Sequence, residues 1–355
     1  MASREDKQPR KFFWMKNFNC GKITEATTRV GSETLFDNKV FMVNFSLGNQ
    51  CNYKCSYCWP ILYANTTPFQ NYNFYNLFID DLKEQVIKKN FEQLTILFTG
   101  GEPTTYKFLG KVVKNFTEKH EKITNNVIIN TNLSPGLSYW KRMRELGRDA
   151  GYFQVCASFH NEYVTPKEFI KKCKDVKASG YGLTVREVVR PDNIDEMIKL
   201  YQQFEDEGIF FELKPMLLGN DNMMTGKKTV DGFTDEDFDR LIALHANSKY
   251  KHEIWPYKMR VETEDESVDI VSEFRLFYNR DTGFKGWNCS AGMNHISVGA
   301  DGVIKRCHDH KNFDIMGNIF TGENPVLFDK PKICPVGYCG TITGLQATKT
   351  RIKDG

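Results

Sequence analysis

Short apolar runs alternate with longer amphipathic stretches through the central part of the chain. The apolar runs are rich in β-branched and aromatic residues and predict strands at 40–46, 94–98, 127–131, 152–159, 183–189 and 210–217. The stretches that follow them carry apolar residues at helical spacing and predict helices at 73–90, 110–120, 137–146, 166–178, 194–207 and 234–248. Six strand–helix units in succession predict an α/β fold with a parallel sheet, whose functional loops lie at the carboxyl ends of the strands.

The segments on either side of this alternation have a different character. Residues 1–38 are polar and basic, and we expect an N-terminal extension in which Cys20 is an incidental thiol. Residues 250–286 are charged and irregular, and we expect a connector there. The sequence therefore predicts a core barrel over residues 39–249 and a small cysteine-rich α+β domain over residues 287–355.

Composition narrows the class of protein. The 355 residues are 40% hydrophobic and 26% charged, which is an ordinary globular balance. A formal net charge of +3 is too small to indicate binding to nucleic acid or to an anionic membrane. No apolar run approaches the ~20 residues of a membrane helix, and no apolar signal segment follows Met1. Ten cysteines without an export signal indicate metal binding or catalysis before disulfides, so we expect a reducing, cytoplasmic location.

Three of these cysteines stand close together in the segment 51–58, which we call the cysteine loop. Cys51, Cys55 and Cys58 have C-x3-C-x2-C spacing, and so short a loop can turn three thiolates onto one iron–sulfur cubane. Three ligands for four irons leave one iron open, as catalytic metal sites require. The alternatives are a zinc knuckle, or a disulfide with a spare thiol. Zinc normally takes a fourth Cys or His nearby, and the nearest histidine downstream is His120, in a different predicted element.

A second motif follows the predicted strand 94–98. The chain runs from it into Gly100, Gly101, Glu102 and Pro103, which we call the GGEP segment. Paired glycines after a strand permit close approach of the backbone to a ligand. Glu102 offers a carboxylate, and Pro103 fixes a turn.

The two motifs together resemble those of the radical S-adenosylmethionine (SAM) superfamily. That family has an aromatic residue before the third cysteine, here Tyr57, and a GGEP segment after the second strand. The resemblance implies a partial (β/α)6 barrel and a [4Fe-4S] cluster bound by Cys51, Cys55 and Cys58. It also implies that the amino and carboxylate groups of SAM chelate the open iron. Reductive cleavage of SAM then gives a 5′-deoxyadenosyl radical, which removes a hydrogen atom from the substrate.

The resemblance also assigns candidate SAM contacts. Tyr57 is expected near the adenine, and the GGEP segment, including Gly100, Gly101, Glu102 and Pro103, is expected to receive the methionine amine. The adenine-binding pattern GxIxGxxE of some members is missing from the fifth strand, which leaves the adenine contacts unassigned.

Further polar residues stand near the ends of predicted strands. Ser158 occupies a place where the family often binds the ribose or the carboxylate, although a polar strand end explains it equally well. Asn130 and Arg186 are weaker candidates for the polar groups of SAM. Arg186 can instead pair with Glu187 or Glu212.

Cys156 is the candidate catalytic residue. Side chains alternate along a strand, so Cys156 and Ser158 should share the inner face of the barrel. A thiol there can donate a hydrogen atom to a substrate radical, but a free cysteine is also a common core residue. His160, His308 and His310 are candidate acid–base groups, although each also fits a surface or supporting position.

Four more cysteines, Cys289, Cys307, Cys334 and Cys339, lie in the C-terminal segment. Apolar runs around Asp301-Gly302 predict a β-hairpin that brings Cys289 near Cys307, and Cys334 with Cys339 can supply two further corners. Four thiolates suit tetrahedral zinc or a fully ligated cluster. The arrangement resembles the twitch domain, a short relative of the seven-cysteine SPASM domain, and implies an auxiliary [4Fe-4S] cluster for electron transfer or structural support.

Three functions are compatible with parts of this pattern. The first is a radical SAM enzyme that acts on a peptide side chain or backbone, or on a sugar or aminocyclitol, with an electron donor such as flavodoxin or ferredoxin. Its N-terminal extension is too short for a peptide-recognition domain of ~80 residues. The second is a non-enzymatic module with structural zinc sites, which has no use for the GGEP segment. The third is an ordinary methyltransferase, and the first strand is not followed by the glycine-rich loop it needs.

Overall fold

The computed structural model describes most of the chain. It covers residues 23–37, 39–58, 67–216, 232–250, 258–272, 276, 283–307, 314–337, 339 and 342–352. The segment Phe12-Phe13-Trp14, Cys20, His308 and His310 lie outside the described residues, as does most of the segment after the sixth predicted strand.

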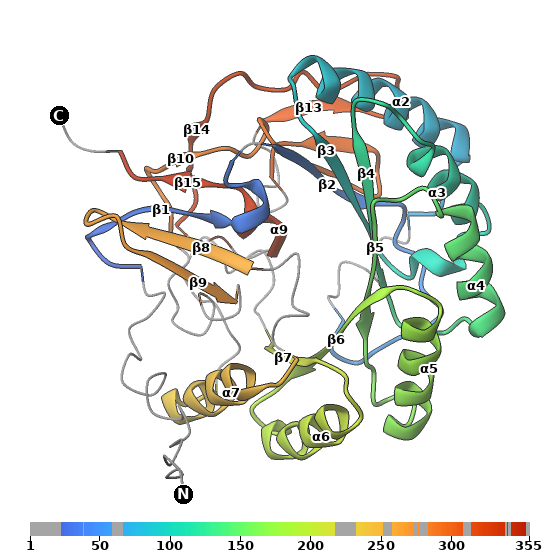
Figure 1. Cartoon of the computed structure of the whole chain (residues 1–355), viewed down its shortest axis with the longest axis vertical. Helices are drawn as coiled ribbons and strands as arrows, with labels where there is room; N and C mark the ends of the chain where they lie inside the picture. The colour runs from blue at the N-terminus through green and yellow to red at the C-terminus, as the bar shows by residue number, and fades with distance from the viewer. Residues whose placement is uncertain are drawn as a thin grey trace, which may run out of the picture.

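The large sheet contains the predicted barrel. Its strand order is β13-β12-β11-β2-β3-β4-β5-β6-β7, and the strands from β2 to β7 are parallel neighbours. These strands are β2 (Val40–Ser46), β3 (Gln93–Thr99), β4 (Thr124–Thr131), β5 (Tyr152–Ser158), β6 (Gly182–Val189) and β7 (Phe211–Pro215). The helices are α2 (Tyr72–Lys88), α3 (Leu109–Thr117), α4 (Leu137–Leu146), α5 (Pro166–Ala178), α6 (Ile194–Asp206) and α7 (Asp235–Asn247). The expected partial (β/α)6 barrel is confirmed, with α2–α6 outside the curved sheet (Figure 1).

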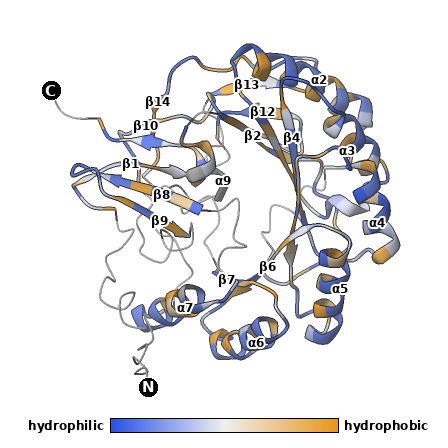
Figure 2. Ribbon diagram, viewed as in Figure 1, coloured by the Kyte–Doolittle hydropathy of each residue, from blue (hydrophilic) through white to orange (hydrophobic). Residues whose placement is uncertain are grey.

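Both faces of the large sheet are covered, which explains why its strands are apolar runs. On β2, Phe41, Val43 and Phe45 pack in the main core, which also contains buried residues of α2, α3 and α5. The alternate residues Val40 and Met42 join a smaller apolar cluster on the other face. Strands buried on both sides read as continuous apolar runs, and Figure 2 shows the mixed colouring of the outer helices beside them.

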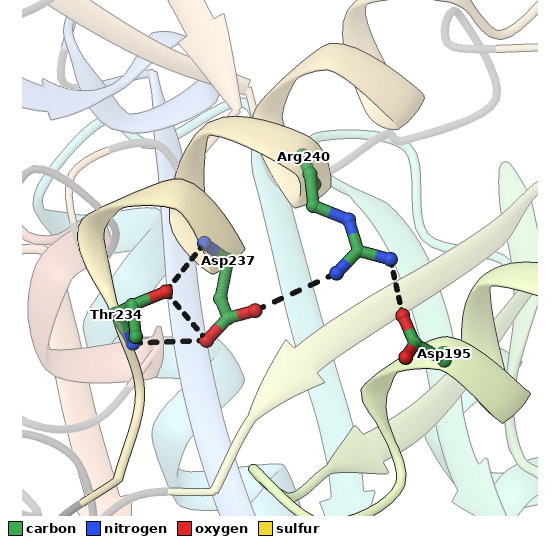
Figure 3. A network of polar contacts seen from close by, with 4 residues as sticks. All are labelled: Asp195, Thr234, Asp237 and Arg240. Carbon is green, nitrogen blue, oxygen red and sulfur yellow. Dashed lines mark hydrogen bonds and ion pairs between the residues drawn. The ribbon is translucent and has the colours of Figure 1, made fainter.

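Capping residues set where the helices begin. Thr234 precedes α7, and its hydroxyl accepts a hydrogen bond from the Asp237 N–H at 3.2 Å. The Asp237 carboxylate accepts from the Thr234 N–H at 2.9 Å, which completes a capping box. Arg240 then pairs with Asp237 and with Asp195 of α6, so the same network joins α7 to the adjacent helix (Figure 3).

The predicted hairpin in the C-terminal segment is present and joins the large sheet. It consists of β11 (His295–Val298) and β12 (Val303–Lys305), which pair antiparallel, followed by β13 (Ile315–Asn318). The Asp301 carboxylate accepts from the Val303 N–H at 3.1 Å in the turn. β11 lies parallel to β2, so the hairpin extends the barrel sheet beyond its first strand.

A second sheet gathers segments from both ends of the chain. Its order is β14-β10-β15-β1-β8-β9, formed by β14 (Lys332–Ile333), β10 (Asn288–Cys289), β15 (Lys349–Thr350), β1 (Thr27–Ser32), β8 (Lys258–Thr263) and β9 (Val268–Ser272). Figure 1 shows β1, β8 and β15 side by side. The short helix α9 (Ile342–Gln346) precedes β15. Among the described residues, no helix is long and apolar enough to cross a membrane.

Two segments outside the barrel are more regular than the sequence predicts. The expectation of an irregular connector is wrong for residues 258–272, which form the antiparallel pair β8–β9. Within the expected extension, residues 27–32 form β1 between β15 and β8. Met259 and Val261 are buried on β8, whereas Arg260 and Glu262 alternate with them and are partly exposed. Charged residues at every second position hid this half-buried strand.

Candidate active site

A cavity of about 430 Å³ opens at the carboxyl ends of the barrel strands. It is lined by residues of the loops after β2, β3, β4 and β5, and by residues of β6 and β7. Of the residues predicted from sequence, it brings together Cys51, Cys55, Tyr57, Cys58, Gly100, Gly101, Glu102, Asn130 and Ser158. Two motifs separated in sequence therefore share one cavity, as parallel strands require.

The cysteine loop is fixed by residues that follow β5. The Tyr163 hydroxyl accepts a hydrogen bond from the Lys54 N–H at 2.6 Å, and the Glu162 carboxylate accepts from the Ser56 N–H at 2.9 Å. The ring of Tyr53 stacks on that of Tyr163, with centroids 4.2 Å apart. These contacts hold the cysteine backbone without using the thiols.

His160 contacts the cysteine loop through its Nδ1 atom. This atom lies 3.4 Å from Cys55 Sγ and 2.7 Å from the Tyr57 hydroxyl. Burial lowers the pKa of His160 to about 4, so the ring is neutral at pH 7. Tyr57 Oη also lies 3.5 Å from Glu187, whose pKa burial raises well above the usual range. His160 thus supports the cysteine loop, which is one of the positions that the sequence allowed for it besides an acid–base role.

The two glycines are required by the approach of residues 48–50, which lead from β2 into the cysteine loop. The Gly101 N–H donates to Gly48 O at 2.9 Å, and the Glu102 N–H donates to Gln50 O at 2.8 Å. A Cβ on Gly100 would lie 2.1 Å from Gly48 O, and one on Gly101 would lie 2.1 Å from Gln50 O. Gly100 also has a φ of +121°, which disfavours any side chain. The sequence predicted a close approach of the GGEP segment to a ligand, and the structure shows that the segment closely approaches the backbone of Gly48 and Gln50.

The Glu102 carboxylate lies in the interior of the site. Glu102 is 1% exposed, and burial raises its pKa. The carboxylate accepts hydrogen bonds from the Thr104 N–H at 3.0 Å, the Thr131 hydroxyl at 2.8 Å and the Asn132 N–H at 2.6 Å. Pro103 begins the short 3-10 turn Pro103–Thr105 and is buried without lining the cavity. Glu102 thus ties the end of β3 to the end of β4.

The weaker candidates fall into two groups. Asn130 and Ser158 line the cavity. Arg186 does not, and its Nε donates to Glu212 Oε2 at 2.8 Å, which is one of the two pairings that the sequence allowed. Cys156 is 2% exposed and packs in the inner apolar cluster with Met42, Leu97 and Ile128. It lies on the inner face as predicted, one layer below Ser158.

Sequence reasoning missed two contributors to this cavity. Lys214, near the end of β7, is a cation among its lining residues. Asn132 also lines it and donates from Nδ2 to Asn52 Oδ1 at 2.9 Å, which links β4 to the cysteine loop. Asn132 directly follows the predicted strand 127–131 and Lys214 lies near the end of the predicted strand 210–217, so their position at strand ends was the signal available.

The four C-terminal cysteines surround a second, small cavity. Its lining contains Cys289, Cys307, Cys334 and Cys339, together with Arg306, Asp314 and Lys349. Three of the four cysteines are buried. The hairpin, β14 and the segment before α9 therefore bring together the cysteines that the sequence grouped.

No disulfide uses the cysteines of either set. None of the nine cysteines in the described ranges forms a disulfide. Within those ranges, no three His, Cys, Asp or Glu side chains are grouped closely enough to hold one metal ion. A cubane holds its ligands farther apart than zinc does, because each thiolate binds a different iron. The placing of both cysteine sets around cavities is therefore compatible with iron–sulfur clusters.

Comparisons with known proteins agree with this geometry. The model of the family described as "Radical SAM superfamily" matches residues 45–209, which include both the cysteine loop and the GGEP segment. The chain is 21% identical over 314 residues to a GTP 3′,8-cyclase of Clostridium botulinum, with 82% of this chain and 88% of the relative covered.

Two solved structures share the fold. Native anSMEcpe with bound AdoMet has a TM-score of 0.53 at 16% identity, with 78% of each chain covered. Streptococcus suis SuiB bound to the precursor peptide SuiA has a TM-score of 0.50 at 17% identity, with 82% of this chain and 65% of SuiB covered. The likeness extends beyond the matched core, since 78–82% of this chain is included.

Proposed function

The chain belongs to the radical SAM superfamily, and on that premise we propose that it cleaves SAM reductively at a [4Fe-4S] cluster held by Cys51, Cys55 and Cys58. One observation carries the proposal: the three cysteines of the cysteine loop line the same cavity as Gly100, Gly101 and Glu102 of the GGEP segment. When bound, the cluster and SAM supply a 5′-deoxyadenosyl radical that abstracts hydrogen from the substrate. The alternative of a zinc-binding module leaves the cavity and the GGEP segment without a role.

The residues of the chain position the cofactors. Tyr163 and Glu162 fix the backbone of the cysteine loop, and the glycines let that loop approach β3. We assign the methionine amine of SAM to Gly100, Gly101 and Glu102, all of which line the cavity, since Glu102 Oε2 accepts a hydrogen bond from the Asn132 N–H and has room for a second. A closed and dry site protects a reactive radical from side reactions.

Other lining residues are assigned to the polar parts of SAM. Asn130 and Ser158 are proposed contacts for its ribose or carboxylate, and Lys214 supplies a positive charge at the same cavity. Tyr57 is proposed near the adenine, with its hydroxyl held by His160 at 2.7 Å. Arg186 is assigned a structural role, because it forms an ion pair with Glu212 and does not line the cavity.

We assign an auxiliary [4Fe-4S] cluster to Cys289, Cys307, Cys334 and Cys339. Four thiolates leave no iron open, so electron transfer or structural support is a better role for it than substrate binding. An electron donor such as flavodoxin or ferredoxin would deliver the electron for SAM cleavage. A reducing, cytoplasmic location suits these cysteines, since the nine described ones form no disulfide.

For the substrate we favour a peptide, with a sugar or aminocyclitol as the alternative. The support is that anSMEcpe and SuiB each bind a peptide in a solved structure. Cys156 remains the proposed hydrogen-atom donor, because it lies on the inner face one layer below Ser158. Unchanged deuterium incorporation into product by Cys156→Ala would return this residue to a purely structural role.

Iron analysis after anaerobic reconstitution tests the proposal. We expect about eight irons per chain from two cubanes, and about four after Cys51, Cys55 and Cys58 are changed together to Ala. Changing the four C-terminal cysteines to Ala should also leave about four irons, with the active cluster retained. A stoichiometric zinc content without iron in either cysteine set would contradict the corresponding assignment.

A further inference from the structure

A lysine is buried beside the four C-terminal cysteines. Lys349 is 1% exposed, and it stands directly opposite Cys289 in the antiparallel pair β10–β15. Its Nζ donates hydrogen bonds to the carbonyl oxygens of Gly344 and Leu345, the latter at 2.9 Å. It also lines the small cavity that the four cysteines surround. Neutral carbonyls alone do not compensate a buried ammonium.

A second cation lines the same small cavity. Arg306 is 6% exposed and lies next to Cys289. Its Nη1 pairs with Asp314 at 3.1 Å, and its Nη2 donates to Lys332 O at 3.1 Å. The Asp314 carboxylate is shared with Lys332, whose Nζ lies 3.2 Å away. The cavity that the four cysteines surround is therefore bordered by two cationic side chains, Lys349 and Arg306.

The charged side chains that line this cavity sum to one positive charge. Lys349 and Arg306 contribute two, and Asp314 removes one. Four thiolates around a core of charge 2+ carry two negative charges, whereas four thiols carry none. The cavity is therefore electrostatically complementary to a metal–tetrathiolate centre and not to four protonated cysteines.

We propose that Lys349 is a charge-balancing residue of the auxiliary centre, so that metal loading and burial of its ammonium stabilise one another. The inference rests on the proposed auxiliary centre. In the loaded protein the ammonium faces thiolates across the β10–β15 pair and favours the negatively charged centre. In the metal-free protein the same ammonium is buried without that charge and lowers stability. Removing the charge must therefore have opposite effects in the two forms.

Thermal unfolding of Lys349→Met and of the unchanged protein, each reconstituted or metal-free, measures this coupling. We expect the variant to raise the midpoint by at least about 2 °C in the metal-free form and to lower it by at least about 2 °C in the loaded form. Lys349→Arg retains the charge and should keep a loaded midpoint near that of the unchanged protein. The active cluster is the same in every pair that is compared, so its contribution cancels.

A matched control and a spectroscopic measurement separate this role from a packing role. Lys83 of α2 also donates to a carbonyl, Asn115 O at 3.0 Å, but it does not line this cavity. Lys83→Met should shift both forms in the same direction. The reduction potential of the auxiliary cluster should fall in Lys349→Met and be restored in Lys349→Arg, because a buried positive charge favours the added electron.

The outcomes separate this inference from the proposed function. Shifts of the same sign in the two forms of Lys349→Met, with the second set of about four irons present, would overturn the role of Lys349 alone. If Lys349→Met does not fold when metal-free, the test becomes the reduction potential of the auxiliary cluster in the loaded Lys349→Met and Lys349→Arg variants. Equal potentials in the two variants overturn the proposal. If iron analysis finds no metal at the C-terminal cysteines, the auxiliary centre and this inference both fail.

Discussion

Replacing Arg186 distinguishes a structural ion pair from a ligand contact. Arg186 Nε and Glu212 Oε2 are 2.8 Å apart, and the two side chains are 13% and 0% exposed. Among the described residues, Glu212 Oε1 has no hydrogen-bond partner, so Arg186 is the main support of this carboxylate. Arg186→Met therefore leaves a buried carboxylate without its cation.

The expected loss of stability is large. Breaking a buried ion pair by removing one partner costs about 3–5 kcal/mol. Total unfolding free energies are about 5–15 kcal/mol, so this loss is a substantial share. The double variant Arg186→Met with Glu212→Leu removes both charges and should recover most of the loss. The expected coupling energy between the two positions is at least about 2 kcal/mol.

Urea unfolding of the metal-free protein at pH 8 measures these stabilities, and equilibrium dialysis of the reconstituted protein measures SAM binding. We expect Arg186→Met to be strongly destabilised, while the protein that remains folded binds SAM with near-normal affinity. The reverse result, an unchanged urea midpoint with at least about a tenfold loss of SAM affinity, would refute the structural role. It would return Arg186 to the polar groups of SAM.

Three further predictions test other parts of the site. Gly101→Ala should lower the iron content of the cysteine loop, because its Cβ would lie 2.1 Å from Gln50 O. The control Gly136→Ala should not, since a Cβ there meets open space, and equal iron contents of the two variants would refute this. His160→Phe should lower the reduction potential of the cluster held by Cys55, since hydrogen bonds to sulfur raise it, and potentiometry showing no change would contradict this contact. Burial raises the pKa of Glu212 to about 7, above its unfolded value of about 4.3, so the stability contributed by its protonated carboxyl is lost as pH rises between these two values. The free energy of unfolding of Glu212→Gln should therefore increase, relative to that of the unchanged protein, by up to about 3 kcal/mol between pH 4.5 and 7. Urea unfolding that shows the same difference between the two proteins at both pH values would refute this.

The barrel was predictable because its strands are buried on both faces. β2 and β3 are continuous apolar runs, and the predicted helices 137–146 and 166–178 coincide with α4 and α5. β8 was missed for the opposite reason, since it has one exposed face and alternates charged and apolar residues. β1 and β9 were missed because they are only six and five residues long and have no clear alternation. That β11 lies beside β2 could not be predicted, because long-range pairing of strands leaves no local pattern.

The site was predictable where residue type alone fixes the chemistry. Cysteine spacing identified both thiol sets, and both gather around cavities. The sequence did not show that Glu102, besides lining the cavity, also ties the end of β3 to the end of β4 through its hydrogen bonds. Lys349 gave no signal, because a lysine near the chain terminus is normally exposed. Its importance depends entirely on its being opposite Cys289 in the second sheet.

Formation of 5′-deoxyadenosine from SAM tests the central claim most directly. The reconstituted protein, reduced with dithionite under anaerobic conditions, should release 5′-deoxyadenosine and methionine in equal amounts. The variant with Cys51, Cys55 and Cys58 changed to Ala should release neither, while it keeps about four irons at the C-terminal cysteines. Cleavage of SAM by that variant, or no cleavage by a protein that holds its full complement of iron, would contradict the assignment of the active cluster to the cysteine loop.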